Sequence, residues 1–179
     1  MADVDIVIEI CGSAGEGTIS AGEILSRAMS RIGFEIMSFD AYPSEIRGFG
    51  KCVAHCRVGS RELLSSGKYT DILIALNDAH AIGQLKSLRE TGIVIFDNKP
   101  PNYLEEDTSI AGWIEPGMIS YGLPLQELAQ KAAGNSRGRN MVALGALAAL
   151  FEVDPEAFSA TIEKRYAKKK RPANASVSR

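Results

Sequence analysis

The sequence is poor in the residue types that usually carry redox and acid–base chemistry. It contains three cysteines and two histidines in 179 residues. An odd number of cysteines is a poor disulfide framework, and an iron–sulfur cluster needs more thiolates than the chain has. Two histidines leave few general bases, and no Ser-His-Asp, paired-carboxylate or metal-ligand constellation stands out. We therefore expect no catalytic residue, no metal and no cofactor bound by this chain alone.

The sequence also lacks an excess of positive charge and a long apolar run. The net charge is −2 and the pI about 5.8, so no basic field indicates nucleic acid. No apolar run reaches the roughly 18 residues that span a membrane, and the first residues lack the basic region of a signal peptide. We expect no nucleic-acid partner, no membrane contact and a cytoplasmic location.

Two of the cysteines, Cys52 and Cys56, flank His55 in a segment that alternates polar and small apolar residues. On a strand the two thiols share one face, while the imidazole points to the other face. A metal site here would need ligands from elsewhere in the chain. The pattern favours buried, small apolar side chains over a metal site.

Short apolar runs alternate with helical patterns through most of the chain. Strands are expected at residues 4–11, 35–39, 51–58, 71–76, 92–96 and near Ile119, the third of them half-exposed or antiparallel. Helices are expected from Thr18 to a C-cap at Gly33, and at residues 79–90, 124–133, 139–151 and 154–166, the last with Asp154 as N-cap. This alternation predicts a three-layer α/β/α sandwich with a parallel or mostly parallel sheet.

The chain has the length and hydrophobic content of a single domain, which we place at residues 1–167. Residues 168–179 form a basic and polar tail that begins KKKR. Such a run is more typical of a solvated end than of a nucleic-acid site.

The stretch EICGSAGEGT, residues 9–18, joins the first strand to the first helix through three glycines. Such a turn places backbone N–H groups and the positive helix end together, which favours an anion. The spacing is neither G-x-G-x-x-G nor a Walker A loop, although Asp40 lies where a dinucleotide-binding acid would stand. Glu16 would repel a pyrophosphate unless it points away. A structural turn, a ligand loop and a dinucleotide site all remain open.

Two further stretches lie where α/β proteins present functional loops. In DAYPSEIRGFG, residues 40–50, the guanidinium of Arg47 is suited to a carboxylate or phosphate, or simply pairs with Glu45 or Asp40. In GNSRGRNM, residues 134–141, Asn140 is a candidate cap for the apolar helix that follows.

Taken together, these stretches resemble the gamma domain of 2-oxoacid:ferredoxin oxidoreductases, the pyruvate/2-oxoglutarate family. The form is closest to the gamma domain fused ahead of 2-oxoglutarate-type alpha subunits. The order and spacing are similar from about Ile6 to Tyr166, with Phe49 standing where the family usually has glycine. The segments that carry the resemblance are GSAGEG, AGEILSRAMSRIGFEI, AYPSEIRGFG, DILIALNDAHA and RNMVALGALAAL.

The resemblance implies a non-catalytic component of an enzyme that oxidatively decarboxylates a 2-oxoacid, such as pyruvate, ketoisovalerate or 2-oxoglutarate, to acyl-CoA and reduces ferredoxin. It implies thiamine diphosphate, Mg and iron–sulfur clusters in partner chains, namely thiamine-binding alpha and beta subunits and a ferredoxin-like subunit. It implies roles for this chain in coenzyme A binding and in assembly. The positions it marks as contact residues are Gly12, Ser13, Gly15, Gly17, Thr18, Tyr42, Ser44, Glu45, Arg47 and Gly48.

Overall fold

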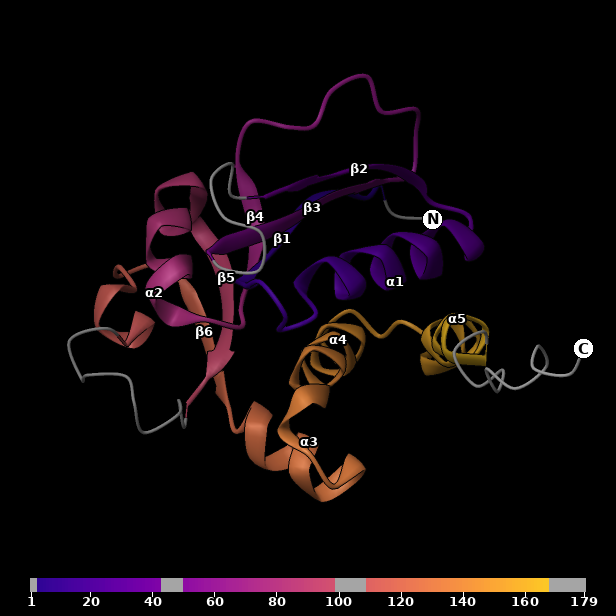
Figure 1. Ribbon diagram of the computed structural model, residues 1–179. Helices are drawn as coiled ribbons and strands as arrows, with labels where there is room; N and C mark the ends of the chain where they lie inside the picture. Colours follow the sequence, from indigo (N-terminus) through magenta and orange to yellow (C-terminus); the bar gives the residue numbers. More distant parts are fainter. Residues whose placement is uncertain (1–2, 43–49, 99–108, 168–179) are drawn as a thin grey trace, which may run out of the picture.

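A six-stranded sheet forms the centre of the computed structural model, which describes residues 3–42, 50–98 and 109–167. The strand order is β2-β3-β1-β4-β5-β6 (Figure 1). The strands are β1 (Asp5–Ser13), β2 (Glu35–Ala41), β3 (Lys51–Gly59), β4 (Thr70–Ala75), β5 (Leu88–Asp97) and β6 (Ile119–Leu123). Strand β3 is antiparallel to both of its neighbours, whereas β1, β4, β5 and β6 pair in parallel. The predicted mostly parallel sheet is therefore confirmed.

Helices cover both faces of this sheet. Figure 1 shows α1, α4 and α5 together on one side and α2 on the other. The helical segments are α1 (Thr18–Arg31), α2 (Asp78–Ala81), η1 (Ile82–Ser87), η3 (Ile110–Trp113), α3 (Leu125–Ala133), η4 (Ser136–Gly138), α4 (Arg139–Leu150) and α5 (Pro155–Ala167). Two hydrophobic clusters, one on each face, form the core. The three-layer arrangement expected from the sequence is confirmed.

Helix α1 packs closely against the sheet because its inward face is apolar and small. Leu25 and Ile24 are fully buried, and burial of such side chains stabilises a fold by about 1.5–3 kcal/mol each. A Cβ on Gly22 would lie 2.4 Å from the Ala54 Cβ, so only glycine permits this approach of α1 to β3. The helix ends at Arg31 with Ile32 as its C-cap residue, and Gly33, the predicted C-cap, follows one residue later with a φ of 98°, as is usual for a glycine that terminates a helix.

The predicted cap of the last helix is confirmed as well. The Asp154 side chain accepts a hydrogen bond from the Glu156 N–H at 2.9 Å, and α5 begins at Pro155.

The sequence predicted that strand β3 is either half-exposed or antiparallel. The strand is antiparallel, and it is not half-exposed. It lies between β2 and β1, so both of its edges are paired and most of its residues are buried. Its alternation of polar and apolar residues has another cause, because the polar His55 has buried hydrogen-bond partners.

The helix predicted at residues 79–90 is wrong. Helix α2 ends at Ala81, a 3-10 segment follows, and Leu88 already opens β5 by pairing with Thr70. The apolar residues Ile82, Leu85 and Leu88 recur every third position, which suits the three residues per turn of a 3-10 helix. Of the helices in residues 3–42, 50–98 and 109–167, none is long and apolar enough to cross a bilayer.

Candidate functional site

The glycine turn joins the carboxyl end of β1 to the first turn of α1, as the sequence predicts. Gly15 and Gly17 have φ values of 92° and 80°, in the left-handed region that glycine adopts without strain. Gly17 is the N-cap residue of α1 and supplies no side-chain cap. The turn therefore gathers backbone N–H groups at the carboxyl edge of the sheet, where α/β proteins usually bind ligands.

The carboxylate of Glu16 points into this turn rather than away from it. It accepts a hydrogen bond from the Ser13 N–H at 2.6 Å and forms an ion pair with Arg139 of α4. Both side chains of the ion pair are largely buried, with exposed fractions of 15% and 12%. The turn thus already holds an anion, supplied by its own chain.

Helix α4 fixes the turn through a second contact. The side-chain amide of Asn140 donates a hydrogen bond to the Gly17 carbonyl at 3.0 Å, and its oxygen accepts the Met141 N–H at 2.9 Å. The sequence suggested Asn140 as the cap of α4, which is wrong, because the N-cap residue is Gly138 and Asn140 lies within the helix. The structure shows that Arg139 and Asn140 join two stretches that lie 123 residues apart in the chain.

Two buried carboxylates that sequence analysis missed brace the same edge of the sheet. Asp78 accepts a hydrogen bond from the Ile110 N–H, and Asp97 accepts one from the Gln126 N–H, each at 3.0 Å. Burial raises the pKa of Asp78 above its usual range, and nearby Asp97 raises it further. Each acid stands at the carboxyl end of a parallel strand, and that position was the signal that could have identified it.

Of the remaining predicted contact residues, three lie within the described part of the chain and four lie outside it. Thr18 lies at the start of α1, and its buried hydroxyl has no hydrogen-bond partner within the described residues. Gly12 packs so close to Thr18 that a Cβ there would lie 2.5 Å from the hydroxyl oxygen. Tyr42 is exposed at the end of β2. The other predicted residues, Ser44, Glu45, Arg47 and Gly48, lie outside the described residues.

The sheet order disfavours a dinucleotide site that uses Asp40. In a dinucleotide-binding unit the strand with the ribose-binding acid lies next to the first strand. Here β3 lies between β1 and β2, and Asp40 pairs with Ala54 of β3. Together with Glu16 in the turn, this arrangement argues against pyrophosphate binding in the dinucleotide manner.

A second polar cluster is buried beneath the connection between β3 and β4. Glu9 and His55 are direct partners across β1 and β3, and their side chains meet at 3.2 Å from Oε1 to Nδ1. The other ring nitrogen, Nε2, lies 2.8 Å from the carbonyl oxygen of Ser66. When Glu9 is ionised, both partners accept hydrogen bonds, so the geometry favours a ring that donates from both nitrogens, the imidazolium form.

The partners of Glu9 extend this cluster across three elements. Gln84 of η1 donates to the second carboxylate oxygen of Glu9 at 3.1 Å and accepts a hydrogen bond from Lys51 at 2.7 Å. The ring of Phe39 stacks on His55 with centroids 4.4 Å apart. The cluster is thus a connected network in which Glu9 and His55 are buried and Phe39 is exposed.

We expect His55 to make the stability of the protein depend on pH. Burial alone would lower the pKa of His55, but its hydrogen bonds to Glu9 and Ser66 outweigh burial and raise that pKa. A raised pKa in the folded state contributes stability fully below the unfolded value of about 6.5. This contribution is lost as the pH rises through the raised folded-state pKa.

An NMR titration of the ring signals measures this effect directly, because His80 is the only other histidine of the sequence. A His80→Asn variant assigns the two signals. The midpoint for His55 should lie above about 6.5, and a midpoint at or below that value would contradict the doubly hydrogen-bonded imidazolium.

The three cysteines are buried, as the sequence favours. Burial raises the pKa of Cys11 to about 12 and also raises the pKa values of Cys52 and Cys56. Thiols held protonated in this way are poor metal ligands and poor nucleophiles. Cys56 instead accepts a hydrogen bond from Ser26 at 3.4 Å in the packing of α1 on β3.

The fold and this edge of the sheet define an α/β domain with helices on both faces and a glycine turn that holds its own anion. The chain belongs to the pyruvate ferredoxin/flavodoxin oxidoreductase family, whose model matches residues 7–178. It is 27% identical to the 2-oxoglutarate synthase subunit KorC of Archaeoglobus fulgidus, with 92% of this chain and 80% of that subunit covered.

Solved structures agree with this assignment. The 2-oxoglutarate:ferredoxin oxidoreductase of Magnetococcus marinus, with 2-oxoglutarate, coenzyme A and succinyl-CoA bound, matches with a TM-score of 0.79 and 27% identity. That match covers 93% of this chain but 28% of the larger one. A keto/oxoacid ferredoxin oxidoreductase gamma subunit of Geobacter sulfurreducens matches with a TM-score of 0.70 and 25% identity, with 89% and 86% of the two chains covered. The predicted resemblance to gamma domains is confirmed.

Proposed function

We propose that this chain is a non-catalytic component of a multisubunit 2-oxoacid:ferredoxin oxidoreductase and that it contributes to coenzyme A binding and subunit assembly. The complex would convert a 2-oxoacid to acyl-CoA and reduce ferredoxin. The observation that carries this proposal is the similarity, over 93% of the chain, to an oxidoreductase solved with coenzyme A bound.

The side chains of this domain support a role outside the chemical step. Its cysteines are buried with raised pKa values, and His55 is held between two hydrogen-bond acceptors. Thiamine diphosphate, Mg and the iron–sulfur clusters would then be bound by partner subunits. Within the proposal, this chain supplies loops and surfaces to that assembly.

The glycine turn is the part of the described chain best suited to an anionic ligand such as coenzyme A. It combines the Ser13 N–H, the N-terminal end of α1 and the guanidinium of Arg139. Glu16 now engages two of these three groups. A phosphate of coenzyme A would therefore compete with the Glu16 carboxylate for Ser13 and Arg139.

A Glu16→Gln substitution tests this competition. Glutamine still accepts the Ser13 hydrogen bond, but it removes one negative charge and leaves Arg139 available to a phosphate. We expect the affinity for coenzyme A to rise about fivefold, which corresponds to about 1 kcal/mol. Calorimetry of the 179-residue chain with coenzyme A measures the change.

A Glu62→Gln variant is the control, because it removes the same charge from an exposed position outside the turn. It should leave the affinity for coenzyme A unchanged. If Glu16→Gln also left the affinity unchanged, the turn would be removed from the coenzyme A site. Binding of NAD or NADP in place of coenzyme A would favour the nucleotide-binding alternative, and absence of any ligand would favour a purely structural adaptor.

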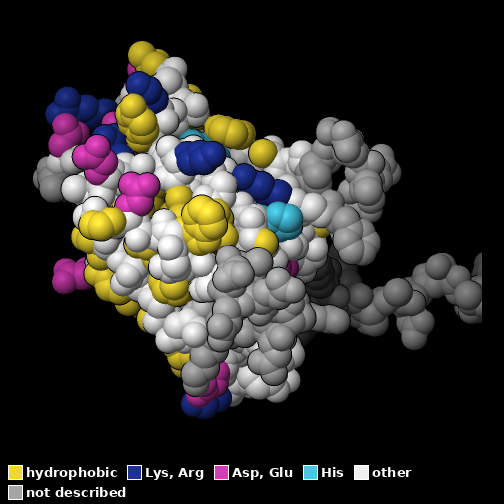
Figure 2. Space-filling view, turned by 90° about the vertical axis from the view of Figure 1, so that its left-hand side faces the viewer, with side chains coloured by type: hydrophobic (Ala, Val, Ile, Leu, Met, Phe, Trp, Pro, Cys, Tyr) yellow, Lys and Arg dark blue, Asp and Glu magenta, His cyan; other side chains and the backbone are white. Residues whose placement is uncertain are grey.

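The proposed role in assembly rests on the exposed surface around β6. This strand lies at the end of the sheet order, and it exposes Ile119 and Tyr121. Trp113, at the end of η3, is also exposed, and Figure 2 shows hydrophobic side chains on the face that carries α2 and η3. A strand at the end of a sheet, with exposed apolar neighbours, is suited to a partner chain. Co-purification with thiamine-binding subunits tests this part, and a tagged chain that purifies alone would contradict it.

A further inference from the structure

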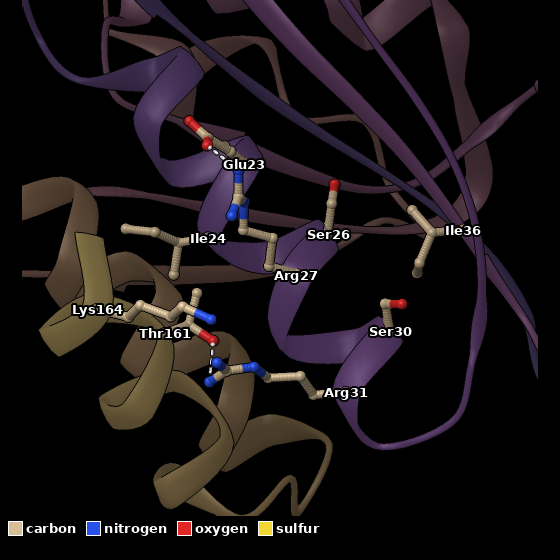
Figure 3. Close-up of a pocket in the computed structure, with 9 residues that line it drawn as sticks. All are labelled: Glu23, Ile24, Ser26, Arg27, Ser30, Arg31, Ile36, Thr161 and Lys164. Carbon is tan, nitrogen blue, oxygen red and sulfur yellow. Dashed lines mark hydrogen bonds and ion pairs between the residues drawn. The ribbon is translucent and has the colours of Figure 1, made fainter.

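A groove lies between α1 and α5, at the end of α1 that is farther from the glycine turn. Its volume is about 560 Å³, within the usual range of small-molecule sites. Figure 3 shows Arg27 and Arg31 of α1 on the side that faces α5, where Thr161 and Lys164 lie. Ser30 and Ile36 extend the groove towards β2.

The groove carries a local excess of positive charge in a chain whose net charge is −2. Three cations line it, and Glu23 is the one acid among the lining residues. Arg27 and Arg31 are four residues apart and therefore share one face of α1. Arg31 stands in the last turn of α1, where a cation also complements the negative end of the helix dipole, and Lys164 adds a cation from α5.

The cations of the groove hold few strong partners. Arg31 donates to the neutral hydroxyl of Thr161 at 3.2 Å, and this hydroxyl donates in turn to the Ala157 carbonyl. Among the described residues, no carboxylate forms an ion pair with Arg31 or Lys164. The pair between Arg27 and Glu23 is exposed, and such a pair contributes little to stability, so an incoming anion can displace it.

We propose that this groove binds the phosphate group of a small phosphorylated molecule. Two guanidinium forks and one ammonium offer more donors than a single carboxylate can accept, and a phosphate has the oxygens to engage them. The half-buried Ile36 provides an apolar contact for the organic part of the ligand. This inference does not rest on the function proposed for the glycine turn, because none of the residues of that turn lines the groove.

Titration of the ¹⁵N-labelled 179-residue chain with inorganic pyrophosphate tests the proposal. We expect a dissociation constant of about 1 mM, with amide shifts concentrated in the second half of α1 and in α5. Arg31→Gln should weaken binding about fivefold, and Lys164→Gln should also weaken it. The control Lys131→Gln removes an exposed cation that pairs with Glu127 on α3, and it should leave binding unchanged.

Three outcomes would overturn the proposal. The first is no binding up to about 10 mM pyrophosphate, which would indicate that the cations pair with a protein carboxylate instead. The second is binding that Arg31→Gln does not weaken. The third is a set of shifts confined to the glycine turn, which would move the anion to Arg139 and support the coenzyme A proposal alone. Urea denaturation of each variant separates lost binding from lost folding.

Discussion

A Gly17→Ala substitution should destabilise the protein by about 3 kcal/mol, because backbone strain at position 17 and a steric clash with Asn140 add together. Alanine at a φ of 80° is strained by about 1 kcal/mol. Its Cβ would also lie 2.3 Å from the Asn140 side-chain nitrogen. Asn140 is buried, so moving it aside breaks its hydrogen bonds to the Gly17 carbonyl and the Met141 N–H. Urea denaturation followed by circular dichroism measures the loss.

Gly15→Ala is the matched control for this prediction. Gly15 also has a positive φ, but a Cβ there meets no atom within 4 Å. It should therefore show only the backbone strain of about 1 kcal/mol. Equal losses for the two variants would show that Asn140 adjusts without penalty and does not hold the turn.

A Glu9→Ala substitution should reduce the free energy of unfolding by about 3 kcal/mol at pH 6, where His55 is charged. The pair is buried, and removal of one member leaves the imidazolium without its counter-charge in a site of low dielectric constant. Gln84 loses a partner as well, because its amide donates to Glu9. Urea denaturation at pH 6 measures the loss, and its repetition at increasing pH measures the decrease of this loss as His55 deprotonates.

The control for Glu9 is Asp3→Ala, which breaks the pair between Asp3 and Arg61. The side chains of that pair are 61% and 80% exposed, so the loss should not exceed about 0.5 kcal/mol. A loss for Glu9→Ala as small as that of the control would contradict the buried network. In that case, the carbonyl of Ser66 and the ring of Phe39 would be the main stabilising partners of His55.

Local patterns in the sequence were sufficient where a single element decides its own structure. The apolar spacing from Thr18 to Ile32 and the glycine at position 33 predicted α1 correctly. The apolar runs in β1, β4 and β5 predicted strands that are buried on both faces. The segment from Ile82 to Leu88 was mistaken for a helix, because its apolar residues have a spacing that a 3-10 turn and an α-helix both accommodate.

Contacts between distant segments were beyond local patterns. The sequence indicated that Glu16 would matter to any anion at the glycine turn, but it could not show that Arg139 pairs with it from 123 residues away. Asp40 stood at a suitable distance along the chain for a dinucleotide site. Only the sheet order revealed that β3 separates it from β1.

The sequence by itself determined the alternation of helices and strands, the glycine turn and the family, because these depend on residue spacing over short windows. Tertiary structure alone decided the position of β3 between β1 and β2, the inward position of Glu16 and the hydrogen-bond partners of His55. The physical reason is that hydrogen bonds and ion pairs depend on distances of about 3 Å between atoms, and folding sets those distances between residues that are far apart in the chain.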